Sequence, residues 1–283
     1  MILSEHAWAK LNLSLDILGL RPDGYHELEM VMQTVSLCDE VNLTLSPSGP
    51  WSICGSGLPM PLDETNLAWR AAEAYFAGTG LHPGLEIRVE KRIPSQAGLG
   101  GGSADAAAVL RALQRHYGLY SQEKLETLAL SLGSDVPFCL LGGCRLARGR
   151  GEQLSELPAL PDCGILIVKP ACAISTGCLY RATDAEQKLP HPDTAALTKA
   201  LGKGDLPAVG KLLCNSFEPL ACRLYPEVEQ LLAALKQTRC LGAAMTGSGS
   251  ACFAIYEDAQ AAREALETLS DPNWLCFVAY SVS

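Results

Sequence analysis

The sequence predicts an α+β fold, in which strands and helices are mixed without the regular strand–helix alternation of a doubly wound sheet. Alternating apolar and polar residues indicate strands early in the chain, and a helical period indicates helices within residues 66–132. The chain has 283 residues, 48% of them hydrophobic, which suffices for two domains or one large one. We predict a boundary near residue 158, with domains at 1–158 and 159–283.

The first part of the chain is rich in strands. Alternation and β-branched residues predict strands at 9–18, 29–37, 41–45 and 85–93. Pro22, Asp23 and Gly24 form a turn signal between the first two strands. Helical periodicity predicts helices at 66–76, 103–117 and 122–132.

The second part begins after a proline-containing stretch at 157–161. A buried strand is predicted at 164–168, followed by helices at 194–201, 206–213 and 227–236, a strand at 251–256, a helix at 259–269 and a strand at 275–281. The closing order of helix, strand, helix and strand fits a ferredoxin-like sandwich.

A glycine-rich segment between the strand at 85–93 and the next helix carries the strongest functional signal. It comprises Pro94, Ser95, Gln96, Ala97, Gly98, Leu99, Gly100, Gly101, Gly102, Ser103 and Ala104. Glycines let a backbone approach a phosphate closely, and a helix start adds N–H groups and a positive dipole end. The Lys-Ser/Thr pair of a Walker A loop and the later acidic residue of a dinucleotide fingerprint are both missing from the sequence. The segment predicts a polyphosphate cradle, and a tight strand-to-helix turn is the alternative.

The pattern Pro-x-x-x-Gly-Leu-Gly-Gly-Gly-Ser-Ala resembles the central motif of the GHMP kinases, the superfamily of galactokinase, homoserine kinase, mevalonate kinase and phosphomevalonate kinase. Residues 7–13 resemble the first motif of that superfamily and residues 243–252 its third, in the same order. The resemblance implies a two-domain GHMP kinase fold, with an N-terminal ribosomal-protein-S5-like domain and a C-terminal ferredoxin-like domain. It also implies ATP as phosphoryl donor, together with Mg²⁺.

Two further segments, 21–28 and 133–138, resemble one member of the superfamily, a kinase whose small-molecule acceptor carries a cytidine diphosphate group. The resemblance therefore implies phosphorylation of an alcohol on such an acceptor. Another small-molecule kinase of the homoserine or mevalonate type is an alternative, as is a non-catalytic member that binds nucleotide. Tyr25 and His26 discriminate between the two kinds of kinase, because an acceptor without a pyrimidine does not need that pair. Lys10, Asp135 and the complete glycine run argue against the non-catalytic member.

Two charged residues are the catalytic candidates. Asp135 follows Gly133 and Ser134 at a predicted helix end and precedes an apolar, strand-like run, where it could accept the proton of the attacking hydroxyl. Lys10 lies inside a predicted strand; paired with Asp135, it would keep that carboxylate ionised and stabilise negative charge on the acceptor oxygen. The alternatives are an ordinary turn aspartate and a lysine that keeps an edge strand soluble.

The candidates for acceptor binding are Asn12, Tyr25, His26, Gly247 and Ser248. Asn12 follows Lys10 by two residues, so an extended strand places both side chains on one face. An aromatic ring can stack on a pyrimidine beside a hydrogen-bonding imidazole, and the resemblance assigns Tyr25 and His26 to the cytidine end. Structural roles are the alternative for each residue, and a plain hairpin turn is the alternative for residues 246–250.

Two more residues concern the nucleotide. Asn66 begins a predicted helix and, by the resemblance, contacts the adenine, although N-terminal capping explains it equally well. Ser103 could contact a phosphate or Mg²⁺, or could cap the helix that follows. The sequence contains no evident set of metal carboxylates, so the metal ligands remain unassigned.

Charge, cysteine content and the absence of long apolar runs indicate which kinds of partner and cellular location to expect for this protein. A net charge of −9 argues against a general nucleic-acid binder. The twelve cysteines are scattered singly, as expected for reduced thiols in a cytoplasmic protein. The sequence contains no signal-peptide pattern and no apolar run long enough to span a bilayer, so we expect no membrane association. A monomer and a weak homodimer are both compatible with the sequence.

Overall fold

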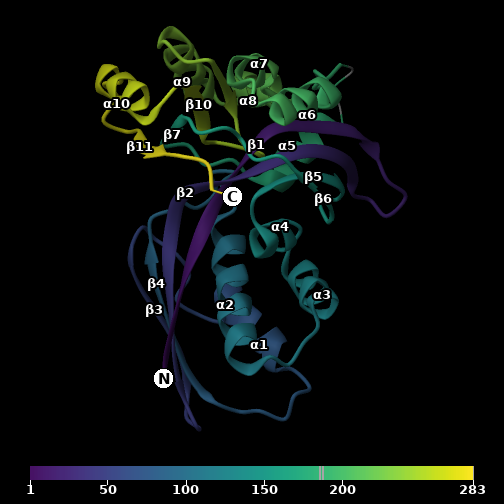
Figure 1. Ribbon diagram of the computed structural model, residues 1–283, viewed down its shortest axis with the longest axis vertical. Helices are drawn as coiled ribbons and strands as arrows, with labels where there is room; N and C mark the ends of the chain where they lie inside the picture. Colours follow the sequence, from purple (N-terminus) through teal and green to yellow (C-terminus); the bar gives the residue numbers. More distant parts are fainter. Residues whose placement is uncertain (185, 187, 283) are drawn as a thin grey trace. The chain divides into compact units, whose positions relative to one another are not determined.

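The computed structural model describes residues 1–184, 186 and 188–282 and divides into two compact units of mixed strands and helices (Figure 1). Unit 1 contains Met1–Ala9, Cys38–Ser95 and Gly100–Leu141, and unit 2 contains Lys10–Leu37, Gln96–Leu99 and Gly142–Ser283. Two long strands, β1 (Ile2–Leu20) and β2 (His26–Ser46), pass through both units. The predicted α+β class is confirmed, while the sequence boundary near residue 158 stays a proposal.

Unit 1 consists of a small group of strands covered by helices. Its further elements are β3 (Trp51–Gly57), α1 (Leu67–Phe76), β4 (Gly84–Lys91), α2 (Gly101–Tyr117), α3 (Gln122–Leu132) and α4 (Val136–Leu141). Strand β4 pairs antiparallel with β2 and parallel with β3. Helix α2 packs against α1, α3 and α4 (Figure 1). Its apolar residues Val109, Leu110 and Leu113 are fully buried.

Three expectations for this part of the chain need correction. The strands predicted at 29–37 and 41–45 form one continuous strand, β2. Helix α2 begins within the glycine run at Gly101, whereas the prediction began at residue 103. The apolar run after Asp135, expected to be strand-like, forms the short helix α4. Periodicity cannot separate a short buried helix from a short buried strand, and Pro137 in the first turn is compatible with a helix because no N–H is needed there.

Unit 2 contains an antiparallel sheet with the order β11-β7-β10-β9. Its elements are β5 (Cys144–Gly149), β6 (Gln153–Leu157), β7 (Gly164–Lys169), α5 (Thr176–Thr183), α6 (Thr194–Lys203), α7 (Leu206–Leu212), β8 (Cys214–Asn215), α8 (Glu218–Leu224), α9 (Pro226–Gln237), β9 (Gly242–Met245), β10 (Cys252–Tyr256), α10 (Ala259–Thr268) and β11 (Leu275–Ala279). Every residue of β7 and β10 is buried, with α10 packed on both strands. Buried central strands covered by helices explain the continuous apolar runs in the sequence.

Two of the remaining strands of unit 2, β5 and β8, pair with the two long strands, and β6 pairs with β5. Strand β5 pairs antiparallel with β2 and with β6, and β8 pairs parallel with β1 at Ser14 and Leu15.

In the two units together, the sequence did not predict strands β3, β5, β6, β8 and β9 or helices α5 and α8. Most of these elements are too short to show a clear period.

The cysteines are free thiols, as expected. Burial raises the pKa of Cys144 and of Cys163 to about 12, so both remain protonated at neutral pH. Within the described part of the chain, no helix has the length and apolar character that crossing a membrane requires.

Candidate active site

The glycine-rich segment leads directly into helix α2. Gly98 and Gly100 have φ angles of 73° and 71°, in the left-handed region that favours glycine. Gly100 is the N-cap residue of α2, so the first turn begins at Gly101. The capping role considered for Ser103 is therefore wrong, because Ser103 lies inside this turn. The first N–H groups of an α-helix lack acceptors within the helix, and here they belong to residues with little or no side chain.

In unit 2, the middle of the glycine-rich segment packs against the loop between β9 and β10. A Cβ atom on Gly98 would overlap the carbonyl oxygen of Thr246. The Thr246 hydroxyl lies 3.3 Å from the Gly98 carbonyl oxygen, to which it donates, and the Ala251 N–H donates to the Ala97 carbonyl at 3.2 Å. This backbone approach requires glycine at position 98.

Lys10 lies beside the same loop. Its side chain is buried, with the residue 4% exposed, so the alternative of a solubilising edge lysine is wrong. The Lys10 ammonium donates to Asn12 Oδ1 at 2.6 Å, which confirms that both side chains share one face of β1. The Asn12 N–H donates to the Thr246 hydroxyl at 3.0 Å, and a Cβ atom on Gly247 would lie 3.2 Å from Lys10 Nζ.

The loop of residues 246–250 connects two antiparallel strands and is thus a hairpin loop, as the alternative stated. Asn215 supports it, although sequence reasoning missed this residue. The Asn215 amide donates to the carbonyls of Met245 and Gly247, both at 2.8 Å, and its Oδ1 accepts from the Phe217 N–H at 2.9 Å. Ser248 forms a hydroxyl–hydroxyl contact with Thr176 at 2.7 Å.

Tyr25 and His26 lie next to aromatic and charged groups of unit 2. Tyr25 is 51% exposed as a residue, and the Arg150 guanidinium lies over its ring at 3.8 Å from the ring centroid. The His26 ring is stacked with Tyr180 at 4.8 Å between centroids, and its Nε2 lies 2.7 Å from Asp184 Oδ1. Because Arg150, Tyr180 and Asp184 come from distant parts of the chain, no local spacing could have indicated them.

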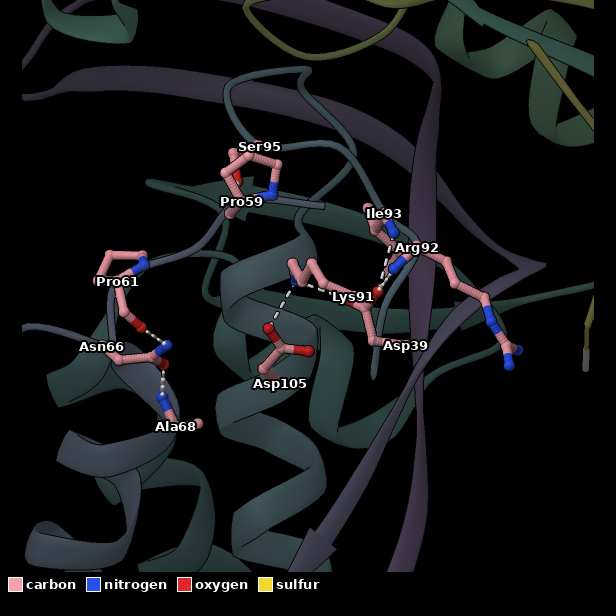
Figure 2. A network of polar contacts seen from close by, with 10 residues as sticks. All are labelled: Asp39, Pro59, Pro61, Asn66, Ala68, Lys91, Arg92, Ile93, Ser95 and Asp105. Atoms are coloured by element: carbon pink, nitrogen blue, oxygen red, sulfur yellow. Dashed lines mark hydrogen bonds and ion pairs between the residues drawn. The ribbon is translucent and has the colours of Figure 1, made fainter. Parts of the chain in front are cut away.

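In unit 1, Asn66 is the N-cap of α1 (Figure 2). Its Oδ1 accepts from the Ala68 N–H at 2.9 Å, and its Nδ2 donates to the Pro61 carbonyl at 2.8 Å. The capping explanation is confirmed, and the adenine contact stays a prediction. Ser95 contacts the Pro59 carbonyl through a long hydrogen bond of 3.4 Å.

Asp135 is also part of unit 1 and lies at the start of α4. Its backbone carbonyl accepts from the Cys139 N–H at 3.0 Å, and the residue is partly exposed. Lys10 belongs to unit 2, so the predicted pairing of the two side chains stays a prediction.

A buried charged cluster lies beside the glycine-rich segment in unit 1 (Figure 2). The Lys91 ammonium donates to Asp39 Oδ2 at 2.5 Å and to Asp105 Oδ2 at 2.6 Å. Burial raises the pKa of Asp105 to about 7, although the nearby Lys91 charge opposes this shift. Burial also disfavours the charged form of Lys91, but the two carboxylates outweigh it and raise the pKa of this lysine. Sequence reasoning missed the cluster, although an aspartate in an alanine-rich helix was a possible signal.

The predicted site residues are thus distributed over both units. Unit 1 holds Asn66, Pro94, Ser95, Gly100, Gly101, Gly102, Ser103, Ala104 and Asp135, whereas unit 2 holds Lys10, Asn12, Tyr25, His26, Gln96, Ala97, Gly98, Leu99, Gly247 and Ser248. Among the described residues, no group of three or more His, Cys, Asp or Glu side chains is arranged to hold a metal ion.

Comparisons with known proteins relate the chain to a kinase family. The family model for the N-terminal domain of the GHMP kinases matches residues 66–143, and the model for their C-terminal domain matches residues 197–273. The 4-diphosphocytidyl-2-C-methyl-D-erythritol kinase of Desulfitobacterium hafniense is 44% identical over 98% of this chain and 94% of its own length. The enzyme of the same name from Pelotomaculum thermopropionicum is 44% identical over 93% of this chain and 92% of its own length.

A solved structure shares the fold over almost the whole chain. The crystal structure of a 4-(cytidine 5'-diphospho)-2C-methyl-D-erythritol kinase superposes with a TM-score of 0.85 and 38% sequence identity. The match covers 99% of this chain and all of the other. The similarity therefore extends over both family domains and is not confined to the three short motifs.

Proposed function

Because the chain belongs to the GHMP kinases, and within them to the 4-diphosphocytidyl-2-C-methyl-D-erythritol kinases, we propose that it phosphorylates the 2-hydroxyl of 4-diphosphocytidyl-2-C-methyl-D-erythritol with ATP. This reaction is a step of the non-mevalonate route to isoprenoid precursors. The observation that carries the proposal is the 44% identity over 98% of the chain to a kinase of that name.

The glycine-rich segment, residues 94–104, is proposed to bind the ATP phosphates. The left-handed glycines and the helix start at Gly101 support this role, since they leave backbone N–H groups available to an anion. We propose that ATP enters as its Mg²⁺ complex, with the Ser103 hydroxyl as a contact to a phosphate or to the ion. Asn66 is proposed to lie near the adenine in addition to capping α1.

Asp135 and Lys10 are the proposed catalytic residues. Phosphoryl transfer requires an aligned acceptor hydroxyl and a group that accepts its proton, and the Asp135 carboxylate is proposed for that task. Lys10 is proposed to stabilise the negative charge that develops on the acceptor oxygen. The burial of Lys10 and its 2.6 Å bond to Asn12 support this role, because they hold the ammonium in place.

Acceptor binding is proposed for Asn12, Tyr25, His26, Gly247 and Ser248. The exposed ring of Tyr25 offers a stacking surface for a pyrimidine, and the contacts of His26 with Tyr180 and Asp184 orient its imidazole. Asn12 and the backbone at Gly247 lie next to the Lys10 ammonium, which is where an acceptor hydroxyl would have to be placed.

The direct test is ADP release by the purified protein with Mg-ATP and one candidate acceptor at a time. The acceptors are 4-diphosphocytidyl-2-C-methyl-D-erythritol, the corresponding polyol phosphate without cytidine, homoserine and mevalonate. Turnover with the cytidylated compound alone is the expected result. Turnover with another alcohol would contradict the acceptor assignment, and no turnover with any of them would support a non-catalytic nucleotide-binding protein.

The role of Asp135 is tested with Asp135→Asn, which removes the charge and keeps the shape. We expect kcat to fall roughly 10²- to 10⁴-fold, while the KM values for ATP and acceptor change little. Asp162→Asn, at an exposed residue of unit 2, is the control and should leave kcat unchanged. Near-normal kcat in Asp135→Asn would contradict the assignment of Asp135 as proton acceptor.

A further inference from the structure

One buried lysine is attached to both ends of the glycine-rich segment (Figure 2). Lys91 is the last residue of β4, just before the segment begins, and Asp105 lies in α2, just after it ends. The 2.6 Å ion pair between them therefore joins the strand that enters the segment to the helix that leaves it. Both side chains are 3% exposed, so little water competes for the contact.

Asp39 of β2 holds the entering strand at the same place. Its Oδ2 accepts from Lys91 at 2.5 Å, while its Oδ1 accepts from the backbone N–H groups of Arg92 at 2.6 Å and Ile93 at 2.8 Å. Pro94, the first residue of the segment, follows Ile93 directly. A single fully buried carboxylate thus binds both the Lys91 ammonium and the backbone that leads into the segment.

The start of α2 packs against the same lysine. A Cβ atom on Gly101 would lie 3.1 Å from Lys91 Nζ and 2.9 Å from Ile93 Cγ2. The backbone of the first helical turn is therefore in close contact with the ammonium and with the end of β4. Lys91 and the start of α2 are thus packed without room for a side chain at position 101.

The cluster is poorly suited to stabilising the fold alone. Two carboxylates share one ammonium, and Asp105 Oδ1 is buried without a hydrogen-bond partner among the described residues. Buried ion pairs are often no more stable than apolar side chains of similar volume, because desolvation offsets their attraction. A role in fixing local geometry explains the arrangement better than a gain in stability.

We propose that Lys91 is a positioning residue for nucleotide binding, which acts through Asp39 and Asp105 to fix both ends of the glycine-rich segment. The backbone N–H groups at the start of α2 are then held in place before ATP binds, so that little ordering of the segment accompanies binding. The inference rests on the proposed function, because ATP is the ligand whose phosphates this segment would hold.

The test is the binding of Mg-ATP to the full-length protein without acceptor, measured by titration calorimetry for the wild type and Asp105→Ala. This substitution detaches α2 from Lys91, while Asp39 still neutralises the lysine and alanine favours the helix. We expect Kd for Mg-ATP to rise at least fivefold, with a circular dichroism spectrum that shows the fold is unchanged. In Asp105→Asn, an amide oxygen can still accept from Lys91, so part of the affinity should return.

Glu86→Ala is the matched control. It also removes a carboxylate of an ion pair, with Arg88 at 3.2 Å, but at a side chain on the same unit that is 42% exposed. Its Kd should equal that of the wild type. Steady-state kinetics add a second readout, because loss of positioning raises the KM for ATP and leaves the KM for the acceptor within about twofold.

The possible results distinguish a failure of the positioning role of Lys91 from a failure of the proposed function. If the wild type binds Mg-ATP and folded Asp105→Ala binds it equally well, the positioning role of Lys91 is wrong and the cluster is only a core ion pair. If Asp105→Ala weakens ATP and acceptor alike, the substitution acts by general disturbance and the inference also fails. If the wild type itself does not bind Mg-ATP, the proposed function is overturned and this inference with it.

Discussion

The two glycine-containing loops of the site are held by different kinds of interaction. In unit 1, the ends of the glycine-rich segment are tied to a buried cluster of charges, Asp39, Lys91 and Asp105. In unit 2, the loop of residues 246–250 is held by neutral groups, chiefly the Asn215 amide and the Thr246 hydroxyl. The first arrangement depends on protonation, whereas the second depends on hydrogen-bond geometry and on the space available to the backbone.

The difference predicts which kind of change destabilises each loop. A buried ionisable group changes its interactions when it gains or loses a proton, so the charged cluster connects local structure to pH. An amide that binds two carbonyls has no such dependence, but its removal leaves buried acceptors without donors. Substitutions in the two regions should therefore be separable by their pH dependence.

The largest effect on stability is expected at Gly98, where the glycine-rich segment contacts the loop of residues 246–250 inside unit 2. Gly98→Ala would place a methyl group against the Thr246 carbonyl and would strain a residue with a φ of 73°. We expect the free energy of unfolding to fall by about 4 kcal/mol, as judged by urea denaturation. Gly102→Ala is the control, since its Cβ atom would lie 3.5 Å from Leu67, an ordinary contact. Equal stability of the two variants would show that the close approach at Gly98 is not rigid.

A somewhat smaller effect is expected at Asn215. Asn215→Leu removes the donors to the Met245 and Gly247 carbonyls and the acceptor of the Phe217 N–H. We expect a loss of about 3 kcal/mol in the free energy of unfolding, with the same value at pH 6 and pH 8. The exposed turn residue Asn273 provides the control, Asn273→Leu, which should change stability by less than about 0.5 kcal/mol. A loss at Asn215 that varied with pH would break the contrast between the two loops.

The smallest effect, and the most specific, is expected for the pH dependence of Asp105. Burial raises the pKa of this carboxyl from its ordinary 3.8 to about 7, so between these values the folded chain holds a proton that the unfolded chain has lost. Stability of the wild type should therefore fall as pH rises through this range, by about 2 kcal/mol in total between pH 5 and pH 7. The charged groups that face Asp105 are Lys91 and Asp39.

Asp105→Asn cannot ionise, so its stability relative to the wild type should rise from pH 5 to pH 7 and then level off. Urea unfolding of both proteins at several pH values measures this difference. Parallel curves would mean that Lys91 keeps Asp105 ionised throughout, and the charged cluster would then be as insensitive to pH as the neutral loop. Glu86→Gln, at a partly exposed carboxylate, should give parallel curves.

Local sequence predicted the longer helices well. Helices α1, α2, α3, α6, α9 and α10 lie within two residues of their predicted ends, because an amphipathic period and capping residues are encoded over neighbouring positions. The strands that were missed, such as β8 with Cys214 and Asn215, exist only through pairing with a partner far along the chain. A two-residue strand has no pattern of its own.

The same division applies to the site. The sequence by itself determined that a glycine-rich segment leads into a helix, that Lys10 and Asn12 share one face of a strand, and that a turn at residues 22–24 separates the first two strands, because these depend on neighbouring residues. Only the tertiary structure decided that Lys91 joins Asp39 to Asp105, that Asn215 supports the Thr246 loop and that Tyr180 stacks on His26. These contacts join residues whose separation in sequence carries no periodic signal. The contacts of Lys91 and Asn215 form because folding brings polar groups together where water is excluded, and the stacking of Tyr180 on His26 forms because folding brings two distant rings together.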